Sequence, residues 1–306
     1  MKKTRKIFSL LLATFVAVFG MLSKQVFAGM DFSVAPMNQK IILTPGENYT
    51  GTFEIINPEY NPGTFYYKLS AEPFFVDENY QPVYKNNGDY NQIVDWIELD
   101  DEEGSVEPNE TSQINFTIHV PKTAPAGGQY AIIRIASDED KYKSEETNGL
   151  SVQSIPTIAH ILYAEVAGET RRSGEIVSTS VPSFLFSGNI SGTTTIKNTG
   201  NVHSDATYTL QVFPFFSKEE VYTNEENPVT STILPGATRT TSVSWDSTPK
   251  IGVFHVIYNA DFEGVESKVD KYVIVCPLWL LFILLACLFV VIFSIIFARK
   301  KSDKKA

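Results

Sequence analysis

Apolar and polar residues alternate along several stretches of this chain. Residues 65–71, 114–120 and 207–212 place an apolar side chain at every second position, with polar residues between. A period of two is typical of a strand with one buried and one solvated face. Turn-forming sequences such as NPEYNPG at 57–63 separate these stretches, and residues 29–272 show no sustained helical stripe. The pattern predicts an all-β fold of the sandwich type.

An internal repeat predicts the number of domains. Residues 51–75 align without gaps on residues 192–216, with nine identities in 25 positions. The alternation keeps its phase in both copies, so the same face is buried in each. We therefore predict two immunoglobulin-like β-sandwich domains in tandem, at 29–167 and 168–272, each near the roughly 100 residues that such a fold needs. The sequence GETRRSG at 168–174 is the predicted linker between them.

The N-terminal residues have the features of a secretory signal peptide. Four cations within the first six residues precede an uncharged stretch at 7–22, and small residues follow at the usual cleavage spacing. This arrangement predicts a signal peptide at 1–28. The alternative is an uncleaved membrane anchor, because the apolar stretch is slightly long for a signal core.

The C-terminal residues predict a membrane span. Residues 273–298 contain no charge, and the part from Pro277 onward is long enough for about 33 Å of helix. A basic tail at 299–306 follows at once. This bias places the C-terminus in the cytoplasm and the preceding domains outside the cell. We predict a single-pass protein of the cell membrane, with a transmembrane helix at 273–298.

Removal of these ends changes the charge of the remainder. The leader holds five of the 25 cations, and the tail holds five more with one of the 35 anions. The exported part therefore has 15 cations, 34 anions and a net charge of −19. Such a charge argues against nucleic acid as a partner, and it favours either cationic ligands or a merely solvated surface.

The cysteines do not define the fold. Cys276 and Cys287 both lie in the predicted span, too far apart along a helix to bridge each other. The exported part is therefore held together by its core. The two thiols are interpreted as small apolar fillers, with palmitoylation or a contact within the membrane as the alternative.

The sequence contains no catalytic constellation. His119, His160, His203 and His255 are scattered without metal-ligand spacing, and no nucleophile motif, phosphate-binding loop or dinucleotide fingerprint occurs. We predict a protein that is not an enzyme, with no catalytic, cofactor-binding or metal-binding residues and no cofactor.

Two kinds of local cluster leave alternatives open. The acidic sequences at 100–103 and 138–140 fit solvated loops or oxygen ligands for Ca²⁺. The sequence PFF occurs at 73–75 and again at 214–216, the same position of the repeat. A core or strand-end role shared by the two domains is the preferred interpretation, and an exposed docking surface is the alternative.

Several strings resemble a known family. They are DFSVAP at 31–36, PGENYTGTFEI at 45–55, DWIEL at 95–99, EPNETSQINFTIHV at 107–120, PKTAPAGGQY at 121–130 and KNTGNVH at 197–203. With the order of parts, they resemble the WxL-interacting surface proteins of Gram-positive bacteria. The resemblance implies a peptidoglycan-binding N-terminal domain, an immunoglobulin-like domain that binds a host or partner protein, a membrane helix and a basic tail. It also implies secreted WxL-type surface proteins as partners.

Three classes of function follow from the sequence. The first is a membrane-anchored extracellular scaffold that binds cell-wall peptidoglycan or other surface proteins through its sandwich surfaces and edge strands. The second is an assembly chaperone that lends an edge strand to immature surface subunits. The third, a hydrolase on a β-scaffold, requires carboxylates clustered in a cleft. The sequence does not indicate which edge strand is open, nor the oligomeric state.

Overall fold

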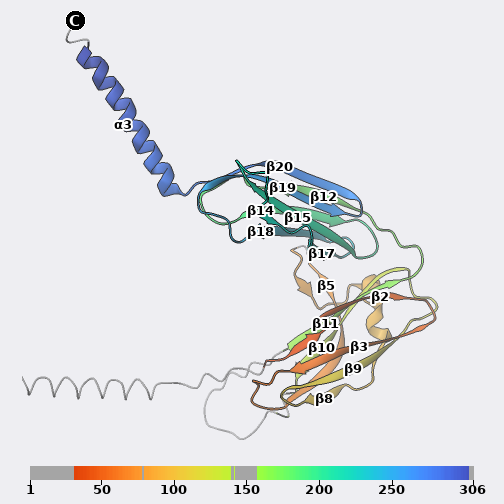
Figure 1. The fold of residues 1–306 in the computed structure, drawn as a ribbon. Helices are drawn as coiled ribbons and strands as arrows, with labels where there is room; N and C mark the ends of the chain where they lie inside the picture. The colour runs from red at the N-terminus through yellow and green to blue at the C-terminus, as the bar shows by residue number, and fades with distance from the viewer. Residues whose placement is uncertain (1–30, 78, 139–140, 142–156, 303–306) are drawn as a thin grey trace, which may run out of the picture.

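Two β-sandwiches follow one another along the chain (Figure 1). The computed structural model describes residues 31–77, 79–138, 141 and 157–302. One helix, α3 (Leu278–Ser302), extends away from the second sandwich. The prediction of tandem immunoglobulin-like sandwiches followed by an apolar helix is confirmed. The predicted signal peptide and residues 303–306 of the tail lie outside the described residues.

The first sandwich packs two sheets around one core. One sheet has the order β1 (Ser33–Ala35), β3 (Asn48–Asn57), β9 (Glu110–His119) and β7 (Ile97–Leu99). The other has the order β2 (Asn38–Leu43), β11 (Thr157–Val166), β10 (Gly127–Ser137), β4 (Phe65–Pro73) and β8 (Glu103–Val106). A hairpin of β5 (Phe75–Val76) and β6 (Pro82–Val83), then two 3₁₀ turns, η1 (Gly88–Tyr90) and η2 (Gln92–Trp96), connect β4 to β7. Alternate residues of the long strands are buried, as their sequence pattern predicts.

The second sandwich has the same plan. One sheet has the order β12 (Gly174–Ser180), β14 (Ile190–Asn198) and β18 (Thr238–Trp245). The other has the order β13 (Phe184–Leu185), β20 (Val265–Val275), β19 (Gly252–Phe262), β15 (Ser204–Pro214) and β16 (Tyr222–Thr223). A further strand, β17 (Val229–Ile233), also pairs with β15.

The repeat extends from the sequence to the topology. In each sandwich the opening segment is divided between the two sheets: β1 and β12 pair with β3 and β14, while β2 and β13 run parallel to the closing strands β11 and β20.

The same hydrogen bond closes a turn in both domains. Asn57 and Asn198, which match in the repeat, are fully buried at the ends of β3 and β14. The Asn57 side-chain amide donates to the Val106 carbonyl at 2.9 Å, and that of Asn198 donates to the Ile233 carbonyl at 2.8 Å. Each carbonyl precedes the turn before the next strand. The repeated asparagines therefore fix the start of the strand that follows.

The uncharged C-terminal run is divided between a strand and a helix. β20 continues through Val275, and α3 begins only at Leu278, later than the predicted boundary at residue 273. The reason is that Val273 and Val275 are buried in the core of the second sandwich, which holds them in the strand. Residues 278–295 of α3 are long and apolar enough to cross a membrane, and none of them is buried in the protein.

The two sandwiches share an apolar joint. Phe74, Tyr130 and Ile132 of the first domain form one buried cluster with Leu234 and Ala237 of the second. The Gly128 amide also donates to the Asn201 carbonyl across the joint at 2.8 Å. The domains are therefore packed on each other as well as linked by the chain.

Candidate binding surfaces

The second domain presents an open sheet edge at β18. This eight-residue strand pairs with β14 over its whole length and stands last in its sheet. Within the part of the chain that the structure describes, no strand pairs with its other side. Backbone N–H and C=O groups on such an edge are available to a strand from another polypeptide.

The edge is open because no described strand of the second domain takes the place that β7 has in the first. In the first domain, β7 covers part of the equivalent strand β9, with Ile97 opposite Ile118. In the second domain β17 pairs with β15, as its counterpart β8 pairs with β4, and β16 also pairs with β15. Both described strands between β15 and β18 therefore belong to the other sheet, and neither covers β18.

Tyr80 of the first domain contacts the residues at the beginning of β18. The Tyr80 hydroxyl, from the turn between β5 and β6, donates to the Thr232 carbonyl. The Arg239 guanidinium donates to the same carbonyl at 2.8 Å and lies 4.6 Å from the centre of the Tyr80 ring. Burial raises the pKa of Tyr80 to about 12, against the opposing effect of Arg239, so this hydroxyl remains a donor. The accessible part of the edge therefore begins at about Thr240.

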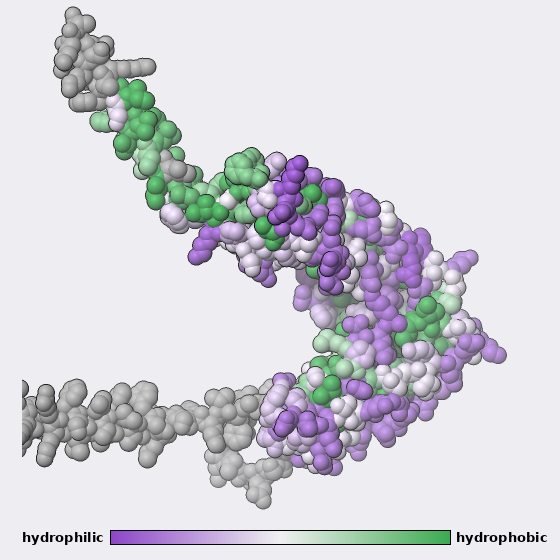
Figure 2. Space-filling view, in the orientation of Figure 1, coloured by the Kyte–Doolittle hydropathy of each residue, from purple (hydrophilic) through white to green (hydrophobic). Residues whose placement is uncertain are grey.

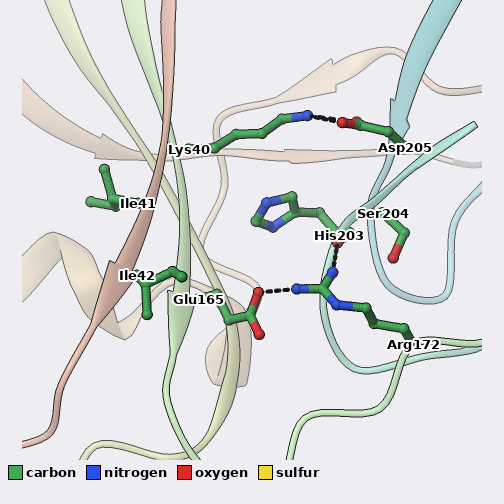
Figure 3. Close-up of a pocket in the computed structure, with 8 residues that line it drawn as sticks. All are labelled: Lys40, Ile41, Ile42, Glu165, Arg172, His203, Ser204 and Asp205. Carbon is green, nitrogen blue, oxygen red and sulfur yellow. Dashed lines mark hydrogen bonds and ion pairs between the residues drawn. The ribbon is translucent and has the colours of Figure 1, made fainter.

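A pocket of about 270 Å³ lies beside the joint between the domains (Figure 3). It is lined by residues of β2, β11, the linker and the start of β15: Lys40, Ile41, Ile42, Glu165, Arg172, His203, Ser204 and Asp205. Two ion pairs cross it, Lys40 with Asp205 and Arg172 with Glu165. The Arg172 guanidinium also donates to the His203 carbonyl at 3.0 Å. All four charges are paired, and the residues that line the pocket therefore join the two domains.

His203 is buried between these ion pairs and two tyrosine rings. Its ring centre lies 5.8 Å from that of Tyr130 and 5.6 Å from that of Tyr163, and 7% of the residue is exposed. Burial, with a smaller effect from the positive charge of Lys40, lowers the pKa of His203 to about 4. The neutral imidazole therefore belongs to the joint at physiological pH.

Acidification is expected to destabilise the joint through His203. Because its pKa is lower in the folded than in the unfolded chain, the unfolded chain binds more protons between about pH 6.5 and 4. Stability is thus complete above pH 6.5 and falls with decreasing pH, by about 3 kcal/mol from this residue at pH 4. Urea unfolding at a series of pH values should show a shallower decrease for His203→Phe than for the parent chain. Identical slopes would contradict the assignment.

The other histidines occupy separate places. His119 and His255 form hydrogen bonds near the surface with the carboxylates of Glu98 and Asp270, each at 2.6 Å. His160 is buried in the first core, stacked on Phe53 with ring centres 4.6 Å apart. Among the described residues, no group of three or more His, Cys, Asp or Glu side chains could hold a metal ion. The predicted lack of enzymatic activity stays a prediction.

The acidic clusters and the cysteines lie on different parts of the fold. Residues 100–103 are exposed, in the turn between β7 and β8 and at the first position of β8. Asp138 is buried and pairs with Lys68 at 2.9 Å, whereas the other two residues of its cluster lie outside the described part. Cys276 lies just before α3, and Cys287 is exposed within it.

The two PFF sequences lie at strand ends, as predicted, but only the first lies in a core. Phe74 is 5% exposed and belongs to the joint between the domains. In the second copy, Phe215 is 51% exposed and Phe216 is 97% exposed. The strand-end role is therefore shared by the two copies, whereas the core role applies only to the first, which the other domain covers.

Solved structures of similar fold cover most of this chain. No family model matches this chain, and no curated protein matches it. One similar structure is a chaperone–tip adhesin complex of CFA/I fimbriae biogenesis, with 12% identity, a TM-score of 0.37, and coverage of 81% of this chain and 99% of that one. The E. coli chaperone DraB has 11% identity, a TM-score of 0.37 and coverage of 79% and 98%. The Pseudomonas aeruginosa chaperone CupB2 has 9% identity, a TM-score of 0.34 and coverage of 76% and 97%.

These observations define a class of protein. The chain is a tandem immunoglobulin-like β-sandwich protein with one apolar C-terminal helix that could anchor it in a membrane. Sequence reasoning predicted edge strands but did not identify β18, because strands that end a sheet alternate in the same way as strands inside it. The single charge of β18, Arg239, does not set it apart either, because the interior strands β14 and β15 also carry only one.

Proposed function

We propose that this protein binds other exported proteins by strand pairing at β18, as a membrane-anchored assembly chaperone or scaffold. The observation that carries the proposal is the unpaired outer side of β18 within the described part of the chain. Strand addition supplies affinity through main-chain hydrogen bonds and specificity through alternate side chains.

The composition of β18 supports pairing with a partner. Edge strands in natural proteins are commonly protected by lysines, prolines, bulges or shortness. The sequence TRTTSVSW has none of these from Thr240 onward, and Thr, Val and Trp all favour strands. By contrast, the exposed positions of β20 carry Glu266, Lys268 and Asp270. β18 is thus a long edge strand without carboxylates in an otherwise acidic exported part.

The helix α3 supports a position at the cell surface. Its apolar segment has no buried residue, and the basic residues Arg299, Lys300 and Lys301 follow it. In the proposed orientation the basic end lies in the cytoplasm and both sandwiches lie outside. Strand pairing would then take place next to the membrane, where newly exported chains emerge.

The resemblance to WxL-interacting proteins supports secreted WxL-type surface proteins as the partner. Peptidoglycan, the other ligand that this resemblance implies, is the second candidate. The two are separated by incubating the full-length protein in detergent with isolated cell wall and, separately, with secreted proteins of the same bacterium. A chaperone would form a transient complex that mature assemblies lack, whereas a scaffold would remain in the assembly.

Two adjacent proline substitutions test the edge. Because consecutive N–H groups of a strand point in opposite directions, one of Thr240→Pro and Thr241→Pro removes a bond to β14 and the other an outward donor. The variant with an unchanged melting temperature identifies the outward position. We expect this variant to lose the secreted partner that the parent protein captures.

Amide exchange provides an independent readout of the same edge. Outward N–H groups in residues 240–245 should exchange more slowly once the captured partner is added. Equal capture by the stable proline variant, together with unchanged exchange in β18, would refute strand pairing at this edge.

A further inference from the structure

Apolar side chains form a continuous row across the end of the second domain. The strand register places Phe184 of β13 beside Ile274 of β20, and Ile274 beside Val253 of β19. The Phe215 amide donates to the Val253 carbonyl at 3.0 Å, which brings β15 into the same row. These four side chains are between 37% and 51% exposed, and Phe216, which follows them, is 97% exposed.

The row lies where the chain enters α3. The Cys276 amide donates to the Leu185 carbonyl at 2.9 Å, so the last strand residues and β13 end together. Leu278, the first residue of α3, follows two positions later. Figure 2 shows the apolar surface of α3 continuing onto the adjacent end of the second domain. The exposed aromatic rings therefore lie at the level at which α3 would enter a bilayer.

The repeat allows the exposed PFF sequence of the second domain to be compared with its counterpart in the first. In the first domain, the PFF sequence at 73–75 is packed into the apolar joint that the second domain completes with Leu234 and Ala237. The matching sequence at 214–216 ends β15 at the same position of the second sandwich, and there Phe215 is exposed in the row that includes Ile274, four residues before α3. Along the chain, the apolar element that follows the second domain is α3 and not another sandwich.

We propose that this end of the second domain, centred on Phe184, Phe215 and Phe216, inserts into the interfacial region of the lipid bilayer that α3 spans. The proposal rests on the membrane anchoring given above and adds a second contact with the lipid. Aromatic side chains are preferred at membrane interfaces, where a ring lies among the headgroups and upper acyl chains. Two separate contacts restrict the tilt of the domain and thereby the direction in which β18 faces.

An apolar origin distinguishes this contact from electrostatic adsorption. The five side chains named above carry no charge, so the contact is expected to form on zwitterionic as well as anionic lipid and to persist at high salt. A second copy of the chain or another protein on the same row would instead shield the rings without bringing them near lipid.

A fluorescent probe at Phe216 tests the proposal. The full chain carries Cys276→Ala and Cys287→Ala, with Phe216→Cys labelled by an environment-sensitive dye, and is reconstituted in phosphatidylcholine vesicles. Val177→Cys is the matched control, because Val177 is also an apolar, exposed residue of the second domain, on β12. Both substituted side chains lie at the surface, so folding is preserved.

We expect the dye at position 216 to emit at a shorter wavelength than in water and to be quenched by nitroxide-labelled lipids. A nitroxide near the glycerol end of the acyl chain should quench it more strongly than one near the methyl end. Position 177 should emit as in water. Flotation with vesicles but water-like emission at 216 would overturn the interfacial contact and leave the anchor standing. A blue shift without lipid quenching would also overturn it, in favour of a protein cover. Failure to float would refute the anchor and this proposal together.

Discussion

Replacement of Asn198 by aspartate is expected to lower the free energy of unfolding by roughly 3–5 kcal/mol. The buried Asn198 amide donates to the carbonyls of Val202 and Ile233, both at 2.8 Å, and its oxygen accepts from the Gly200 amide at 2.8 Å. A carboxylate of the same shape has no donor for these carbonyls, and it places a negative charge against them. The loss of donors and the buried charge therefore act in the same direction.

The repeat and an exposed asparagine provide the controls. Asn57→Asp should have a comparable effect in the first domain, since Asn57 donates to the Gly63 and Val106 carbonyls. Asn227→Asp, on an exposed loop of the second domain, should change the free energy by less than about 0.5 kcal/mol. Chemical denaturation followed by fluorescence measures all three. A loss below about 1 kcal/mol for Asn198→Asp would show that the turn does not depend on this side chain.

Truncation of the chain before Leu278 is expected to move the protein from the membrane fraction to the medium. The 18-residue segment Leu278–Ile295 has a mean hydropathy of 3.1 and no residue buried against the sandwiches. Its removal takes away the only described helix that could cross a bilayer and leaves β20 complete through Val275. Fractionation of the source cells, or of a bacterial host, measures the distribution.

A shorter truncation is the matched control. Removal of residues 303–306 alone keeps α3 and the basic residues Arg299, Lys300 and Lys301, so the protein should stay with the membrane. If the chain lacking α3 remained bound to membranes through Phe216 and its neighbours alone, the aromatic contact would be stronger than proposed. If it remained bound after those side chains were also replaced by serine, α3 would not be the anchor.

The pattern of residues determined the architecture to a large extent. Period-two alternation at 65–71, 114–120 and 207–212 corresponds to β4, β9 and β15, because one face of each strand must be buried. The repeat at 51–75 and 192–216 corresponds to two sandwiches with the same topology. These properties are local or periodic, so they can be recognised without knowledge of which strands meet.

Other features depend on contacts between distant residues. The sequence alone predicted the same role for both PFF motifs, yet Phe74 is covered and the matching Phe215 is exposed, because only the first copy has a domain packed on it. His203 is unremarkable in the sequence and becomes a buried neutral group only where Tyr130 and Tyr163 meet the second domain. No local pattern encodes this burial.

The sequence by itself determined an all-β body, its duplication and an apolar C-terminal segment, because alternation, repetition and hydropathy are properties of single segments. Only the tertiary structure decided that β16 and β17 both pair with β15 and leave β18 open, and that Phe74 is covered whereas Phe215 is exposed. Both outcomes depend on which distant strand offers a partner for the backbone and a core for the side chain. Strand partners that lie far apart along the chain are therefore what tertiary packing adds to the sequence pattern.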